Sequence, residues 1–218
     1  MSFGGHPLAY PIGVTLGALA VCAAWAPFAT VDQSAALATV ALAILGYTGV
    51  RLATAFGRLP NGLPDAGAVR VARVRQQHRL VSRSWLEVAG PGDSRRWLPI
   101  YFDPALLTMT EAEGRSGRVI RTGDLRLYPS GRARDTEPPG RLLDNPTRPD
   151  PDASLLAATA TRPTRRLLFD VQSAVAAPFA ALLWIYIDGG ALLTFTGALC
   201  VAAATTTWLA AIRGSDPS

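Results

Sequence analysis

Very few side chains in this sequence have the types and spacing that catalysis requires. The only histidines, His6 and His78, are far apart in the chain, so their spacing does not indicate a shared site. Glu111 and Glu113 could pair as general acid and base, but they stand beside Gly114 in a pattern typical of an exposed loop. The sequence has no phosphate-binding loop, dinucleotide fingerprint or nucleophile elbow. We therefore expect a protein that is not an enzyme.

The two cysteines do not indicate a metal centre or a redox centre. Cys22 and Cys200 both lie in long apolar segments. Two thiols alone cannot complete a zinc or iron–sulfur site, and a disulfide between them is not expected. We expect both to be small packing residues in a protein that binds no metal and no cofactor.

Arginine carries the strongest chemical signal in the chain. Twenty of the 21 arginines lie between Arg51 and Arg166, lysine is absent, and twelve acidic residues in the same segment leave it a net charge of +8. This charge could set the topology of a membrane protein, contact anionic lipid headgroups or bind nucleic acid. Nucleic-acid binding is the weakest interpretation, because the sequence contains no recognised nucleic-acid-binding module. The candidate headgroup contacts are the arginines nearest the apolar segments: Arg51, Arg58, Arg162, Arg165, Arg166 and Arg213.

The arginine-rich middle is framed by apolar segments that could cross a membrane. A spanning helix needs about 20 apolar residues. Four segments come close to that length or exceed it: residues 8–28, 34–56, 167–187 and 190–212. The second span requires the side chain of Arg51 to extend toward the headgroups. The sequence thus predicts an integral membrane, α-helical protein with two transmembrane hairpins, residues 1–58 and 164–213.

The distribution of positive charge predicts the orientation. The turn inside each hairpin contains an acidic residue, Asp32 or Asp188, and no arginine. Nearly all the positive charge follows Arg51, in the segment between the hairpins. Because loops rich in arginine remain on the cytoplasmic side, we expect a multi-pass plasma-membrane protein with both termini and the central segment in the cytoplasm.

Residues 68–134 are predicted to form a small cytoplasmic β-rich domain between the hairpins. Apolar and polar residues alternate there in several short runs. The predicted runs are Val69–Val74, Leu80–Val88, Trp97–Phe102, Leu106–Thr110, Arg118–Arg121 and Leu125–Tyr128. Gly90–Asp93 separates the second and third runs and reads as a hairpin loop. Trp85 and Trp97 lie in these adjacent runs, and we expect at least one of them to be buried.

Residues 135–163 are predicted to be an extended linker. The segment is rich in proline, which disfavours helices and central strands. Helix is expected to resume near Pro163, because proline suits the first turn of a helix.

Small residues recur at four-residue spacing on three of the spans. Such rows let helices approach closely, and close packing drives helix association in lipid. The candidate helix–helix interface residues are Gly13 and Gly17 on the first span, Gly49, Ala53 and Gly57 on the second, and Gly190, Thr194, Ala198, Ala202 and Thr206 on the fourth. We expect partners among other membrane proteins, including permease-type subunits.

Two functions from different classes fit these patterns. The first is a non-catalytic accessory or assembly subunit of a larger inner-membrane complex, held there by its small-residue helix faces. The second is a stand-alone membrane enzyme or carrier that acts on lipid-linked or phospholipid substrates and holds phosphates with arginine. A stable stoichiometric partner would favour the first, whereas activity of the isolated chain would favour the second.

The composition and layout also resemble a known group of proteins. The use of arginine in place of lysine and the hairpin–β-domain–hairpin plan resemble small envelope proteins of actinobacteria, especially mycobacteria. The segments Ser84–Val88 and Trp97–Pro104 are distinctive but match no defined motif. The plan is similar to that of the accessory membrane proteins of mammalian-cell-entry (Mce) lipid importers. This resemblance implies a role beside a permease and its ATPase in moving fatty acids or sterols, and it carries over no functional residue.

Overall fold

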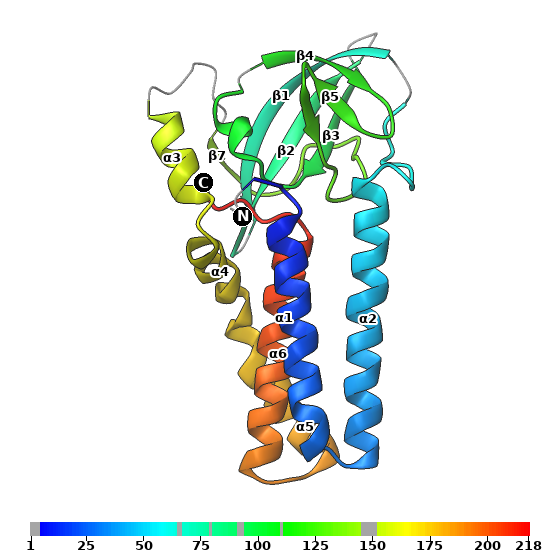
Figure 1. The fold of residues 1–218 in the computed structure, drawn as a ribbon, viewed down its shortest axis with the longest axis vertical. Helices are drawn as coiled ribbons and strands as arrows, with labels where there is room; N and C mark the ends of the chain where they lie inside the picture. The colour runs from blue at the N-terminus through cyan, green and yellow to red at the C-terminus, as the bar shows by residue number, and fades with distance from the viewer. Residues whose placement is uncertain (1–4, 65–66, 79, 91–93, 110, 145–151) are drawn as a thin grey trace.

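A helical bundle stands below a curled antiparallel sheet in the computed structural model of the chain (Figure 1). The structure describes residues 5–64, 67–78, 80–90, 94–109, 111–144 and 152–218. Among these residues, four helical segments are long and apolar enough to cross a membrane: Ala9–Phe28, Val31–Ala55, Pro163–Asp188 and Leu192–Ile212. The predicted architecture, two helix pairs with a β-rich domain between them, is confirmed at this level.

The first helix pair consists of α1 (Ala9–Trp25), a short 3-10 turn and α2 (Val31–Ala55). α2 begins earlier than the apolar pattern predicts because Thr30 caps it. The Thr30 hydroxyl accepts a hydrogen bond from the backbone N–H of Gln33, and the Gln33 side chain accepts one from the backbone N–H of Thr30. α2 ends before Gly57, which has a φ of 74° and lies against Val119 of the sheet domain. Gly57 is therefore not on the helix face where the four-residue spacing placed it.

The third span is interrupted, whereas the fourth is continuous. It contains α4 (Pro163–Val171), a 3-10 segment (Gln172–Ala176) and α5 (Ala177–Asp188). Pro178, near the start of α5, has no backbone N–H to donate, so regular α-helix does not run through this point. The predicted start of helix near Pro163 is confirmed.

The fourth span is the single helix α6 (Leu192–Ile212). Gly190 precedes it in the turn after α5, with a φ of 115°. The sequence spacing placed Gly190 on the helix, but the chain needs this left-handed conformation to turn back, so Gly190 lies outside the small-residue row.

The helices share a small apolar core. Cys22, Ile44 and Trp208 are buried in it, and the Trp208 indole N–H donates to Thr48 Oγ1 at 3.1 Å. Cys22 and Cys200 are free thiols. Large apolar side chains such as Leu16 and Phe179 are instead exposed on the outside of the bundle. An outer surface of this kind suits contact with hydrocarbon.

In the described part of the chain, the sheet contains seven strands, and the pairings between them are antiparallel. The strands are β1 (Gly67–His78), β2 (Val81–Ala89), β3 (Arg95–Ile100), β4 (Glu111–Ser116), β5 (Ile120–Thr122), β6 (Leu125–Leu127) and β7 (Arg141–Asp144). β2 pairs along most of β1, whereas β4 and β7 pair with successive parts of its other edge. β1 is therefore shared by three neighbours, and the sheet curls around an apolar core.

Two predictions about the sheet domain are confirmed. Trp85 is only 7% exposed, and Leu86, Leu98 and Ile100 are fully buried. The backbone N–H of Gly90 donates to the carbonyl of Ser94, so a hairpin joins β2 to β3 as expected. Residues 91–93 of the predicted hairpin loop lie outside the described residues.

Two local predictions in the domain were wrong. Residues Pro104–Leu107 form a 3-10 turn instead of the strand predicted from Leu106 onward, because the Asp103 carboxylate caps the turn by accepting the N–H of Ala105 at 2.9 Å. Glu111 and Glu113 belong to β4 and not to a loop, although both side chains are exposed as expected. Residue 110 is not described.

The predicted linker contains two regular elements. β7 pairs with β1, which is possible because residues 141–144 include no proline and keep their backbone donors. α3 (Ala153–Ala160) follows, and Ala160 packs on Phe102 and Leu107. Residues 145–151, which include Pro146, Pro149 and Pro151, lie outside the described part of the chain.

Candidate functional sites at the helix–sheet junction and in the helix bundle

The chain after α6 returns to the sheet and pairs with β2. Ser215 forms a backbone bridge with Arg83, and the N–H of Asp216 donates to the carbonyl of Ser82 at 2.8 Å. The Asp216 carboxylate lies 2.8 Å from the Arg73 guanidinium, and both side chains are fully buried. The last turn of the chain is thus held to the sheet by a buried ion pair.

The charge state of Asp216 follows from its neighbours. Burial by itself would raise the pKa of Asp216, but the Arg73 guanidinium and hydrogen bonds donated by Ser218 and Ser84 lower it below its ordinary value. The carboxylate is therefore ionised at neutral pH. The Asp216 carboxylate anchors the tail, the segment that follows α6, because Arg73, Ser84 and Ser218 all hold it in one ionised state.

Further contacts tie the helix ends to the sheet. The Tyr101 hydroxyl donates to the carbonyl of Ile212 at 2.8 Å, and Arg51 donates to the carbonyl of Ser130 at 2.7 Å. Tyr101 also packs with Leu8 and Ala55 in a small buried cluster. Burial raises the pKa of the Tyr101 phenol, so the hydroxyl remains a neutral donor.

A second set of side chains connects α1, α4 and the tail. The Asp170 carboxylate accepts hydrogen bonds from the Tyr10 hydroxyl at 2.6 Å and from the Ser215 hydroxyl at 3.0 Å. Arg166 stacks on the Tyr10 ring, with its guanidinium carbon 4.0 Å from the ring centre, and is only 7% exposed. Arg166 was predicted to contact headgroups, but Tyr10 and Phe102 cover it. The exposed part of Arg166 is therefore small, and its contact with headgroups remains a prediction.

Two of the predicted headgroup arginines meet at Tyr47. The Tyr47 oxygen accepts hydrogen bonds from Arg51 and, at 3.1 Å, from Nε of Arg213. Their guanidinium carbons lie 4.7 Å and 5.9 Å from the centre of the Tyr47 ring. Arg83 of β2 lies close to Arg213 in the fold, because its backbone forms a bridge with Ser215. Burial and the positive charges of Arg213 and Arg51 lower the pKa of Arg83 to about 10. We call Arg51, Arg83, Arg213 and Tyr47 the arginine cluster.

The remaining predicted headgroup arginines are dispersed. Arg58 and Arg162 are exposed. Arg165 is half-buried, donates to the carbonyl of Pro217 at 3.3 Å and stacks on Phe169. Of the six predicted residues, the structure therefore gathers only Arg51 and Arg213 into a common site.

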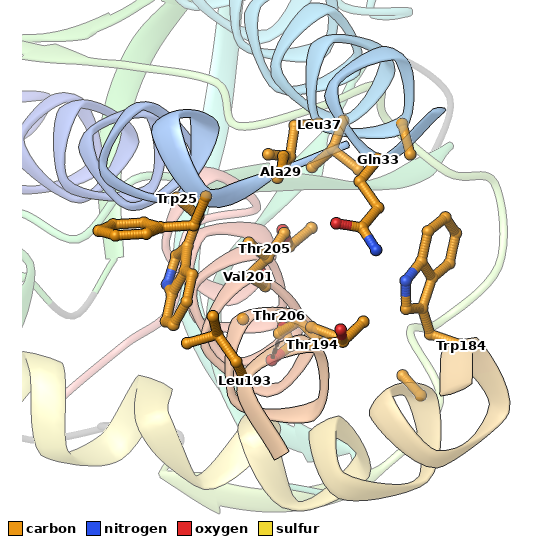
Figure 2. A pocket seen from close by; sticks show the side chains of 17 residues that line it. Trp25, Ala29, Gln33, Leu37, Trp184, Leu193, Thr194, Val201, Thr205 and Thr206 are labelled. Carbon is orange, nitrogen blue, oxygen red and sulfur yellow. Dashed lines mark hydrogen bonds between the residues drawn. The ribbon is translucent and has the colours of Figure 1, made fainter. Parts of the chain in front are cut away.

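The small-residue row of α6 faces a groove. This α2–α6 groove has a volume of about 390 Å³ and lies between α2, α5, α6 and the end of α1. Its α6 side is formed by Thr194, Ala198, Ala202 and Thr206, together with Gly197, Val201 and Thr205. In Figure 2, Trp25 and Trp184 stand on opposite sides of the groove, and Gln33 of α2 projects between them. The side-chain amide of Gln33 donates a hydrogen bond to the Asp188 carboxylate at 2.8 Å.

A second groove lies between α1, α4 and α6. It has a volume of about 650 Å³, and Gly13 and Gly17 line its α1 side. Arg166 lines the groove as well. Gly49 and Ala53 line neither groove, and Gly49 lies on the exposed side of α2.

Within the described residues, no group of three or more His, Cys, Asp or Glu side chains is placed to hold a metal ion. The sites that can be built are therefore the arginine cluster, which can bind an anion, and the two grooves, which can hold apolar chains. No protein-family model, curated protein or solved structure matches this chain.

Proposed function

We propose that this chain is a non-catalytic accessory subunit of a larger membrane complex, and that its helices bind a transmembrane helix of another membrane protein. The observation that carries this proposal is the position of the α6 row. Thr194, Ala198, Ala202 and Thr206 line the α2–α6 groove instead of closing against a neighbouring helix of the chain. Small residues at this spacing favour close helix packing in lipid, where packing drives association.

The chemistry of the groove favours an apolar helix as its occupant. Its lining residues include no Asp, Glu, Lys, Arg or His side chain. The amide of Gln33, the most polar lining group, already donates to Asp188. A polar or charged substrate would find no ionic partner there, whereas a helix rich in small and aliphatic residues would pack against both α2 and α6.

The proposal also includes the orientation of the chain in the membrane and the class of its partner. The arginine-rich sheet domain and both termini lie in the cytoplasm, and the four helices cross the plasma membrane, as the positive-inside rule suggests. Permease-type subunits are the partner class. The resemblance in layout to Mce accessory proteins makes an importer of fatty acids or sterols a candidate complex.

Copurification of partners with leucine variants tests the proposal. Ala198→Leu and Ala202→Leu each add bulk inside the groove, while Ala38→Leu adds the same bulk on an exposed position of α2 that does not line it. All three changes keep the helices apolar, so membrane insertion should survive. We expect the two groove variants to lose the partner and the Ala38 variant to retain it.

The opposite result would remove the basis of the proposal. If Ala198→Leu and Ala202→Leu recovered the same partners in the same amounts as the unmodified chain, a partner helix would not occupy the groove. If the native membrane yielded no stoichiometric partner at all, the accessory-subunit function itself would be rejected.

A further inference from the structure

The arginine cluster gathers three positive charges that have no carboxylate partner among the described residues. Arg51 and Arg213 both donate to the Tyr47 oxygen, and Arg83 lies in the strand that bridges to Ser215, two residues beyond Arg213. All three side chains are half-buried. In the part of the chain that the structure describes, none of the three forms an ion pair with a carboxylate.

The carboxylates of Asp216 and Asp170, which are buried, already have other partners. Asp216 binds Arg73, and Asp170 accepts hydrogen bonds from Tyr10 and Ser215. Like charges that are partly removed from water repel one another more strongly than exposed ones. The lowered pKa of Arg83 reflects this repulsion together with burial. An external anion would relieve it.

The depth of the cluster and the geometry of arginine identify the anion. Arg51 lies one turn before the end of α2 at Ala55, and Arg213 directly follows the last residue of α6. The ends of membrane spans lie at the level of the lipid headgroups. The planar guanidinium fork matches the oxygen atoms of a phosphate, to which it can donate two parallel hydrogen bonds.

We propose that Arg51, Arg83 and Arg213 form a binding site for a phosphate group. Tyr47 acts as a positioning residue, because its oxygen and ring hold the side chains of Arg51 and Arg213 in place. The phosphate could belong to the headgroup of an anionic phospholipid or to a free phosphate compound. The chemistry of recognition is the same in both cases, and this site does not depend on the partner helix proposed above.

Thermal unfolding of the full chain in neutral detergent tests the site and separates the two sources. We expect added phosphatidylglycerol to raise the melting temperature and phosphatidylcholine at the same concentration to have little effect. Inorganic phosphate forms the third arm. Stabilisation by phosphatidylglycerol alone assigns the site to a lipid, whereas stabilisation by inorganic phosphate alone assigns it to a soluble compound. If none of the three additions changes the melting temperature, the proposal is overturned.

Variants show whether the arginine cluster is responsible. Arg83→Gln should raise the melting temperature in the absence of anions, because it relieves repulsion, and should raise the half-saturating ligand concentration by about tenfold or more. Arg58→Gln removes the same charge from an exposed position just beyond the end of α2, and it should do neither. Arg213→Gln is a second variant. Native mass spectra measure how much phosphatidylglycerol it retains. The site would be refuted if added ligand raised the melting temperatures of Arg83→Gln and Arg213→Gln as much as that of Arg58→Gln.

Discussion

Replacement of Asp216 by leucine should destabilise the sheet domain, because it removes the carboxylate of a buried ion pair with Arg73. Arg73 and Asp216 are both fully buried and lie 2.8 Å apart. Leucine is apolar and larger than aspartate. The variant therefore removes the ion pair and the hydrogen bonds that Ser84 and Ser218 donate to the carboxylate, and it adds bulk at a buried position.

The magnitude follows from the burial. Removing one partner of a buried ion pair typically costs about 3–5 kcal/mol, because the remaining charge stays buried and unpaired. For a domain of about 60–100 residues, each kcal/mol lowers the melting temperature by about 4–8 °C. Even the lower limits of both ranges give a fall of about 12 °C. Most mesophilic domains melt between about 45 and 65 °C. A fall of this size therefore removes much of the interval between the growth temperature and the melting temperature.

The assay is the temperature at which a protease begins to cleave the sheet domain of the full chain in detergent. The matched control is the double variant Arg73→Met/Asp216→Leu, which replaces both charges by apolar groups. Such replacements are often neutral or stabilising, so we expect the double variant to recover most of the lost stability. If Asp216→Leu melts within about 2 °C of the unmodified chain, the tail is not an integral part of the domain.

The same ion pair predicts a dependence on pH. The folded-state pKa of Asp216 lies below that of the unfolded chain, so the unfolded chain binds a proton more readily in acid. The contribution of the carboxylate to stability is therefore present above about pH 4, near the ordinary aspartate value, and is lost as the pH falls through the folded-state pKa. The unmodified chain should lose stability below about pH 4 more steeply than the double variant.

The remaining predictions concern the core and the topology. Trp85→Ala should cost about 3–5 kcal/mol, as expected for a buried aromatic residue, and make the domain protease-sensitive, whereas Leu80→Ala, at an exposed position, should change stability by less than about 0.5 kcal/mol. Equal resistance of both variants would contradict the packing of the sheet. In a cysteine-free background, single cysteines at Asp32 and Ala191 should react with an impermeant thiol reagent outside intact cells, and one at Glu111 should react only after lysis. All three positions are exposed, so the reverse pattern would invert the orientation.

The helices and the main strands were predictable from the sequence because their signals are local. Long charge-free segments gave the four spans, and alternation gave β1, β2 and β3. Errors arose where a few residues override a pattern. Thr30 extends α2 by capping it, and Asp103 converts a predicted strand into a 3-10 turn. Caps of this kind act through single hydrogen bonds, to which periodicity is insensitive.

The candidate sites were less predictable, because they depend on contacts between distant segments. Arg83 stands in a segment with many arginines, and only the fold brings its strand to the end of α6, through the bridge between Arg83 and Ser215. Asp216 is far from Arg73 in sequence, and nothing in the pattern of either residue indicates their pairing. Asp170 was the one available signal, since an ionisable residue within a predicted span suggests a buried partner.

Photocrosslinking from the α2–α6 groove tests the central claim most directly. A photoreactive residue in place of Ala202 lies in the groove, and one in place of Ala38 lies on an exposed face of α2. In the native membrane, the account predicts a covalent adduct between the Ala202 position and another membrane protein, and adducts mainly with lipid at Ala38. Adducts with lipid alone at Ala202 would contradict the claim that this groove binds a partner helix.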